Sequence, residues 1–147
     1  MKKVIVFIFV ATSLFSFTIQ AQNKADDIIG VWLTNGKAPA KIQIYKSGEK
    51  FYGKIIWLKN ATENGKQKSD SNNPDKTKKN NPILGLVLLS DFKFDGDDKW
   101  DEGEIYDPES GKTYSSYLSL KDNNILKVRG YVGISLFGRT ETWTREN

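Results

Sequence analysis

The sequence predicts an all-β protein, a small antiparallel up-and-down barrel of about eight strands. Two observations carry this prediction: short runs of β-favouring residues recur between turn residues, and no window shows a sustained helical period of apolar residues. A closed sheet has no exposed edges, and a barrel of eight strands has an interior that is either filled by side chains or just wide enough for one small ligand. A sandwich of two sheets is the competing architecture.

The expected strands follow one another from residue 30 almost to the end of the chain. Residues 41–45 alternate polar and apolar side chains with the period of two that a half-buried strand requires. The expected strands are residues 30–34, 41–45, 51–58, 84–92, 104–107, 112–121, 125–131 and 137–145. Because tight turns join most of them, each strand is expected to run antiparallel to the next.

The first 21 residues differ from the rest of the chain. Two lysines precede an apolar stretch of 16 residues from Val4 to Ile19, and the small residue Ala21 stands before a polar segment. This is the pattern of a secretory signal segment, and the stretch is shorter than the roughly 20 residues that a membrane-spanning helix needs. We expect cleavage after about Ala21, a single domain over residues 22–147, and no membrane span after cleavage.

The composition excludes several kinds of chemistry and of partner. The 147 residues include no cysteine and no histidine, so disulfides, thiol nucleophiles, a Ser-His-Asp triad and zinc sites built on these residues are excluded. Export without disulfides indicates a bacterial periplasmic or secreted protein. The net charge of +4 includes two lysines of the signal segment, which leaves +2 without it. We therefore expect no nucleic-acid partner.

No catalytic constellation is recognised, and we expect a protein that is not an enzyme and needs no cofactor. The carboxylates of Asp101, Glu102, Glu104 and Asp107 would be exposed in a short hairpin, where nothing indicates the raised pKa that glycoside hydrolysis requires. The serines have no histidine to activate them. No glycine-rich segment has the strand–loop–helix context of a phosphate-binding loop.

The 59–81 segment is polar, with six lysines and almost no apolar residue. Its composition is too polar to join a core, so we expect a solvated loop. Asn73, Pro74 and Asp75 within it form a turn sequence in which the Asn and Asp side chains bond their own backbone, and their expected role is structural.

The 91–109 segment is acidic, with nine acidic residues against two lysines, and we expect a solvated hairpin. Residues 91–102 match a twelve-residue calcium loop at positions one, five, six and twelve. Lys93, however, stands where a ligand oxygen should be. We therefore expect no metal site here.

The sequence has a glycine–tryptophan motif at the first expected strand and basic residues in the last expected strand. Gly30-x-Trp32, together with Arg145 or Arg139, resembles the lipocalins and the wider calycin group. The resemblance implies that Trp32 closes one end of the barrel and that an arginine lies over its ring. A guanidinium stacked on an indole combines packing with a cation–π interaction.

A second resemblance covers residues 28–145 and rests on motifs in a fixed order. The motifs are Gly30-x-Trp32, Tyr52-Gly53-Lys54-Ile55, Asn73-Pro74-Asp75, Pro82-x-Leu84-Gly85-Leu86, Gly103-x-Ile105-Tyr106-Asp107-Pro108, Gly111-Lys112-x-Tyr114, Arg129-Gly130-Tyr131 and Trp143-x-Arg145. They resemble the bacterial exported family known as domain of unknown function 2147. That resemblance implies a calycin-like β domain, with no established activity and no catalytic residues.

The expected function is the binding of a small apolar or amphipathic molecule inside the barrel, because such pockets combine apolar walls with a few polar anchors. The expected lining residues are Trp57, Leu86, Leu88, Tyr106, Tyr114, Leu118, Val128 and Tyr131. The alternative is a non-catalytic interaction module with a filled barrel. Such a module would dock on an envelope protein through the 59–81 loop or the 91–109 hairpin.

Overall fold

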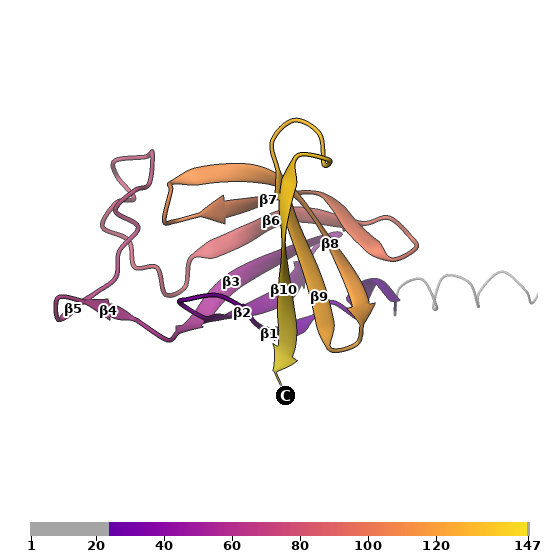
Figure 1. The fold of residues 1–147 in the computed structure, drawn as a ribbon, viewed down its shortest axis with the longest axis horizontal. Helices are drawn as coiled ribbons and strands as arrows, with labels where there is room; N and C mark the ends of the chain where they lie inside the picture. Colours follow the sequence, from indigo (N-terminus) through magenta and orange to yellow (C-terminus); the bar gives the residue numbers. More distant parts are fainter. Residues whose placement is uncertain (1–23, 147) are drawn as a thin grey trace, which may run out of the picture.

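The structure, a computed structural model, describes residues 24–146, which form a closed antiparallel barrel (Figure 1). The barrel strands are β1 (Gly30–Leu33), β2 (Ala40–Ser47), β3 (Lys50–Leu58), β6 (Val87–Phe94), β7 (Lys99–Asp107), β8 (Lys112–Asp122), β9 (Ile125–Tyr131) and β10 (Gly138–Glu146). Each strand pairs with the next along this series, and β10 pairs with β1 to close the barrel. The predicted up-and-down barrel of eight strands is confirmed, and the sandwich is excluded.

Two short strands lie outside the barrel. β4 (Thr62–Glu63) and β5 (Lys66–Gln67) pair as a small hairpin in the connection between β3 and β6, which extends to the left in Figure 1. One helical turn at residues 24–26 precedes β1. Within the described part of the chain, no helix has the length and apolar character to cross a membrane. The expected signal segment, residues 1–21, lies outside the described residues.

The start of β6 differs from the prediction. The strand begins at Val87 rather than at residue 84. The apolar residues before it form a turn instead, because Gly85 adopts a φ of 91°. In that turn the amide of Gly85 donates a 2.8 Å hydrogen bond to the carbonyl of Ile55 on the neighbouring strand β3. A left-handed residue of this kind interrupts a strand, and glycine adopts it at little cost.

The acidic segment also differs from the prediction. β7 begins at Lys99 rather than at residue 104, and its Trp100 is 1% exposed inside the barrel. Of the 91–109 segment, only residues 95–98 and 108–109 lie outside strands. The expected solvated hairpin is therefore wrong, because alternate side chains of this acidic run complete the barrel interior.

Trp32 and Arg145 seal one end of the barrel. The Trp32 indole is fully buried and donates a 2.9 Å hydrogen bond to the carbonyl of Ile28. The guanidinium carbon of Arg145 lies 4.2 Å from the centre of the indole ring. Gly30 has a φ of 145°, and a Cβ there would lie 2.6 Å from Nη1 of Arg145. The glycine of the motif therefore makes room for the arginine, and Arg145 rather than Arg139 takes this position.

The same guanidinium ties three parts of the chain together. Its Nη2 donates to the carbonyl of Asp27 at 2.6 Å, and its Nη1 donates to that of Ile29 at 2.9 Å. Its Nε donates to the carbonyl of Asn123 at 2.5 Å. Arg145 thus joins the end of β10 to the segment before β1 and to the turn between β8 and β9.

Large side chains fill the half of the barrel next to this seal. Trp100 packs edge-on against Phe51, with ring centres 6.4 Å apart, and donates a 3.0 Å hydrogen bond to the carbonyl of Ala25. A Cβ at Gly103 would overlap the ring of Phe92, so this glycine makes space for that ring. The buried side chains of this half are Ile28, Trp32, Ile44, Phe51, Phe92, Trp100, Leu118 and Leu126.

We expect Trp32→Ala to lower the free energy of unfolding by about 3–5 kcal/mol, because it removes a large and fully buried aromatic side chain. Equilibrium unfolding in urea measures the change. Trp57→Ala is the matched control, since the Trp57 side chain is 42% exposed, and it should cost much less. Equal losses for the two variants would contradict the role given to Trp32.

Candidate functional site

The half of the barrel away from Trp32 is hollow and opens at the surface. This cavity has a volume of about 760 Å³, which lies within the range of small-molecule sites. Every barrel strand except β1 contributes to its wall. The barrel strands contribute the aliphatic side chains of Ala40, Ile42, Ile55, Leu88, Ile105 and Val128 to the wall. The barrel is thus filled at one end and open at the other.

Five of the eight residues that the sequence nominates as cavity lining belong to the wall: Leu88, Tyr106, Tyr114, Val128 and Tyr131. Of these, Tyr106 and Tyr131 pair with the exposed residues Thr113 and Ser115, which places them at outward positions of their strands. Trp57, Leu86 and Leu118 do not line the cavity. Leu118 belongs to the filled half, and Leu86 is a half-buried residue packed against the core.

Trp57 lies on the outer face because of a register shift between β2 and β3. Ile42 pairs with Ile55, but Lys41 pairs with Trp57, so β3 carries one extra residue at this point. An extra residue reverses the alternation of a strand. The indole therefore faces outward, where Nζ of Lys41 lies 5.6 Å from its ring centre.

The sequence analysis missed the contribution of β10 to the wall. Arg139, Glu141 and Trp143 all line the cavity. The indole of Trp143 donates a 3.2 Å hydrogen bond to Oε2 of Glu141, and Oε1 of Glu141 lies 3.9 Å from Nη2 of Arg139. Their spacing of two residues along one strand was the available signal, since it places all three on one face. The result is a charged pair at the rim above an apolar interior.

Ser116 lies on the inward face of β8 between Tyr114 of the cavity wall and Leu118 of the filled half. It is fully buried, and its hydroxyl is the one buried side-chain polar atom of residues 24–146 for which the structure shows no hydrogen-bond partner. An unpaired buried hydroxyl is costly. A buried hydroxyl group without a hydrogen-bond partner therefore lies at the boundary between the filled half and the cavity.

The polar 59–81 connection is anchored at the cavity mouth. Asp70 is 1% exposed. Its Oδ1 accepts a 2.7 Å hydrogen bond from the hydroxyl of Tyr106 in the cavity wall. Its Oδ2 accepts a 2.6 Å hydrogen bond from the side-chain amide of Asn73. A buried carboxylate requires donors of this kind. The expectation of a fully solvated loop is therefore wrong at Asp70.

A second contact holds this connection against the turn between β7 and β8. The side-chain amide of Asn72 donates a 2.8 Å hydrogen bond to the carbonyl of Glu109. Gly111 has a φ of 69°, and a Cβ there would overlap the carbonyl of Asn72. Gly111 thus allows the close approach of two connections at the same end of the barrel.

The Asn73-Pro74-Asp75 sequence orders the connection beyond Asp70. Oδ1 of Asn73 accepts a 2.9 Å hydrogen bond from the backbone amide of Asp75, and Oδ1 of Asp75 accepts a 3.0 Å bond from that of Thr77. The hydroxyl and the amide of Thr77 lower the pKa of Asp75. Two successive turns of this type give the segment a defined shape.

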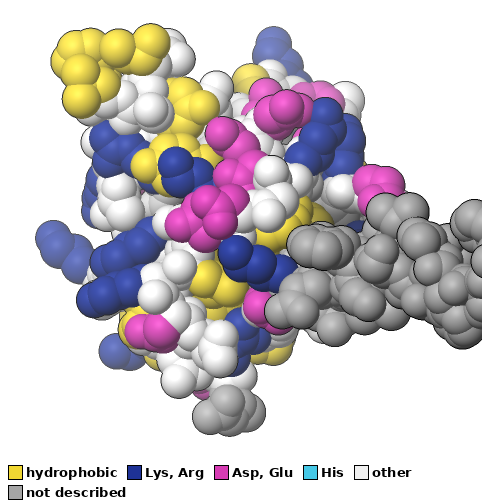
Figure 2. Space-filling model, turned by 90° about the vertical axis from the view of Figure 1, so that its right-hand side faces the viewer, with side chains coloured by type: hydrophobic (Ala, Val, Ile, Leu, Met, Phe, Trp, Pro, Cys, Tyr) yellow, Lys and Arg dark blue, Asp and Glu magenta, His cyan; other side chains and the backbone are white. Residues whose placement is uncertain are grey.

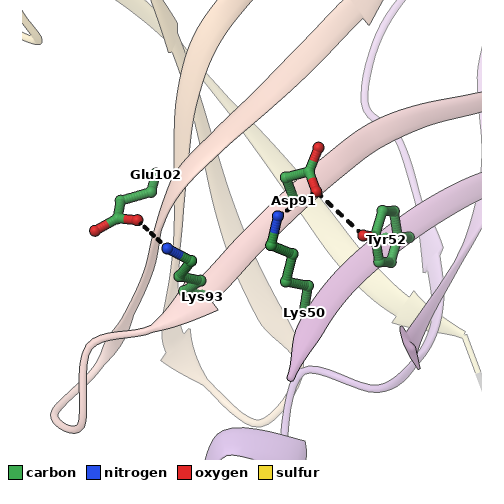
Figure 3. A network of polar contacts seen from close by, with 5 residues as sticks. All are labelled: Lys50, Tyr52, Asp91, Lys93 and Glu102. Carbon is green, nitrogen blue, oxygen red and sulfur yellow. Dashed lines mark hydrogen bonds and ion pairs between the residues drawn. The ribbon is translucent and has the colours of Figure 1, made fainter. Parts of the chain in front are cut away.

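Two acidic residues of the calcium-loop comparison, Asp91 and Glu102, are paired with lysines (Figure 3). Asp91 accepts hydrogen bonds from Nζ of Lys50 at 2.7 Å and from the hydroxyl of Tyr52 at 3.1 Å. Glu102 accepts a 2.6 Å bond from Nζ of Lys93. These hydrogen bonds lower the pKa of both carboxyl groups. Among residues 24–146, no three Asp or Glu side chains are grouped so that they could hold a metal ion.

The hydroxyl of Tyr106 is a persistent donor at the mouth. Burial raises its pKa to about 12, and the hydrogen bond to Asp70 acts in the same direction. Since an unfolded tyrosine titrates near 10, the folded state favours the protonated phenol. This contribution to stability is complete below pH of about 10 and is lost as the pH rises towards about 12.

We expect Tyr106→Phe to lower the free energy of unfolding by about 1–3 kcal/mol at neutral pH, because the buried carboxylate of Asp70 loses one of its two donors. Urea unfolding at pH 8 measures this loss. The variant should also lack the part of the alkaline destabilisation, between about pH 10 and 12, that comes from Tyr106. Tyr117→Phe, on the outer face of β8, is the control. A wild-type pH profile for Tyr106→Phe would contradict the assignment.

The barrel is similar to a protein of known structure, and the sequence matches a known family. The similar solved structure is protein HP1028 from the human pathogen Helicobacter pylori, which is described as a member of the lipocalin family. The two sequences are 25% identical, the TM-score is 0.74, and the match covers 82% of this chain and 83% of that chain. No curated protein sequence is significantly similar. Residues 30–145 match the family model described as an uncharacterized protein conserved in bacteria, DUF2147. The chain therefore belongs to the DUF2147 family, and its fold is lipocalin-like.

Proposed function

We propose that the protein binds a small amphipathic molecule, with the apolar part in the barrel and the polar part at the mouth. The observation that carries this proposal is the open cavity of about 760 Å³, which has aliphatic walls inside and charged side chains at its rim. Each methylene group that leaves water for such a wall contributes about 0.8 kcal/mol. An apolar chain is therefore the natural occupant of the interior.

The filled half of the barrel limits the length of that occupant. Below the cavity, Phe92, Trp100 and Leu118 occupy the interior and are at most 1% exposed. A ligand enters at the mouth and ends above these side chains. Its polar group then lies near Arg139, Glu141 and Asp107, which line the mouth. Because this set carries both signs of charge, it suits a polar or zwitterionic group.

The similarity to a protein of the lipocalin family supports the proposal, because a barrel of this size that is not filled by side chains is wide enough for one small ligand. A binding role is also favoured over a catalytic one. Of the carboxylates considered for acid–base chemistry, Glu102 is paired with Lys93. Asp107 accepts hydrogen bonds from the backbone of Glu109 and the hydroxyl of Ser110 in its own turn.

The alternative, docking on an envelope protein, has less support. The 59–81 connection is held against its own barrel through Asp70 and Asn72. In the 91–109 segment, Asp91 and Glu102 form ion pairs with Lys50 and Lys93 of the same chain. We also propose that the protein acts in the bacterial periplasm or outside the cell, on the basis of the lysines, apolar stretch and Ala21 at the start of the sequence.

Ala40→Phe should weaken ligand binding by about tenfold or more, equivalent to about 1.4 kcal/mol, because Ala40 lines the cavity and the added ring occupies it. The measurement is titration with a dansyl-labelled undecanoic acid, followed by the increase in dansyl fluorescence. Native mass spectrometry of the protein purified from its own cells checks for a bound natural molecule that is lost on unfolding.

Ala38→Phe is the matched control, because Ala38 is exposed and lies outside the cavity wall. It should bind the probe like the wild type. Two results would overturn the proposed function: no uptake of the probe together with a ligand-free native mass, or equal affinity of the Ala40 and Ala38 variants.

A further inference from the structure

The loop between β9 and β10 exposes four apolar side chains at the cavity mouth. Val132, Ile134, Leu136 and Phe137 are 71%, 59%, 75% and 73% exposed. The loop projects beyond the strands at the top of Figure 1, and Figure 2 shows hydrophobic side chains gathered on a protrusion at that end of the molecule. A cluster of exposed apolar side chains on a soluble domain indicates an interaction site. We call residues 132–137 the apolar tip.

Hydrogen bonds from the Arg129 side chain fix the apolar tip relative to strands β9 and β10. Nε of Arg129 donates to the carbonyl of Ser135 at 2.8 Å, and its Nη2 donates to that of Leu136 at 3.2 Å. Its Nη1 donates to the hydroxyl of Thr140 at 2.8 Å. Gly133 has a φ of 73°, which turns the chain at the start of the tip. The tip is thus pre-organised, and little further ordering is needed when a partner buries it.

The two ends of the barrel carry opposite charge. The connections at the mouth, residues 34–39, 59–86, 108–111 and 132–137, contain seven lysines and four acidic residues. The segments at the sealed end, residues 24–29, 48–49, 95–98 and 123–124, contain one lysine and six acidic residues. The apolar tip therefore projects from the basic end of the molecule. Arg139, two residues after it, is 87% exposed and adds a further cation.

We propose that the mouth of the barrel docks on an anionic lipid bilayer, with the apolar tip in the headgroup region and the lysines of the mouth facing the lipid phosphates. Apolar side chains and basic residues at one end are the combination that binds an anionic membrane surface. The sealed end, with its excess of acidic residues, faces away from the bilayer.

A bilayer fits this end better than a second copy of the chain. A symmetric dimer through the tip would bring two basic ends together, and like charges oppose such contacts. A stable protein interface also uses about 20–30 residues on each side, whereas the tip is a narrow projection of six residues. A bilayer needs no matching shape.

Docking in this orientation places the cavity mouth at the membrane. Val132, Leu136 and Phe137 belong both to the apolar tip and to the cavity wall. A molecule could then pass between the lipid phase and the barrel without crossing water. The docking itself does not depend on ligand binding, so the two proposals can fail separately.

The test is flotation of residues 22–147 with vesicles of phosphatidylcholine alone and of phosphatidylcholine with phosphatidylglycerol at low salt. We expect the protein to float with the anionic vesicles and to be released as salt is raised, since screening weakens the attraction of the lysines. Absence of flotation with anionic vesicles, or equal flotation with both compositions, would overturn the proposal.

The double variant Leu136→Ser/Phe137→Ser removes the most exposed part of the tip and should lose most of the flotation while keeping the wild-type melting temperature. Ile29→Ser is the control, because Ile29 is 39% exposed at the sealed end, and it should float like the wild type. Unchanged flotation of the double variant would overturn the proposal. So would a wild-type dimer in size-exclusion chromatography that the double variant converts to a monomer.

A labelled cysteine reports the orientation, since the chain contains no cysteine of its own. We expect an environment-sensitive dye on Ser135→Cys to shift to shorter emission wavelength on anionic vesicles. The same dye on Asp97→Cys, in the turn between β6 and β7 at the sealed end, should not shift. A shift at Asp97→Cys with none at Ser135→Cys would contradict the proposed orientation.

Discussion

The packing of Arg145 on Trp32 is the contact on which the rest of the barrel depends. β1 has only four residues and pairs with β10 at three positions, which is a short ladder with which to close a sheet. Arg145 extends that closure, because its guanidinium covers the indole and donates hydrogen bonds to carbonyls on either side of the seam. A planar guanidinium can stack on the indole and donate several hydrogen bonds at once, whereas the ammonium group of a lysine cannot stack in this way.

The seal also decides which part of the barrel interior is filled. Trp32 and the helical turn before β1 close one end, and Phe51, Phe92 and Trp100 fill the space above them. A Cβ at Gly53 or Gly103 would overlap the side chain of Leu89 or Phe92, so backbone and side chains are in close contact at both positions. Close-packed protein interiors do not admit a ligand without rearrangement. The hollow half, lined by residues of seven strands and of the connections at the mouth, is therefore a separate region of the interior.

Polar side chains hold two of the connections that build the mouth. Asp70 holds the long β3–β6 connection to Tyr106, and Arg129 holds the apolar tip to β9 and β10. Connections on a rigid barrel are where binding residues concentrate. Here the rigid sheet supplies the apolar interior. The connections supply the charge, the exposed apolar side chains and the polar groups at the rim.

The sequence alone predicted the closed antiparallel barrel, and its family resemblance predicted the sealing tryptophan. Alternation along a strand is a local property, so the sequence also predicted inward residues such as Tyr114, Leu118 and Val128. Only the tertiary structure decided which inward residues fill the barrel and which line a cavity, since Leu118 and Val128 are buried cross-strand partners of which only Val128 lines the cavity. It also placed Trp57 outside, through a register shift between two strands. The anchoring of Asp70 and of the apolar tip depends on partners in other segments, and a sequence pattern carries no signal for contacts of that kind.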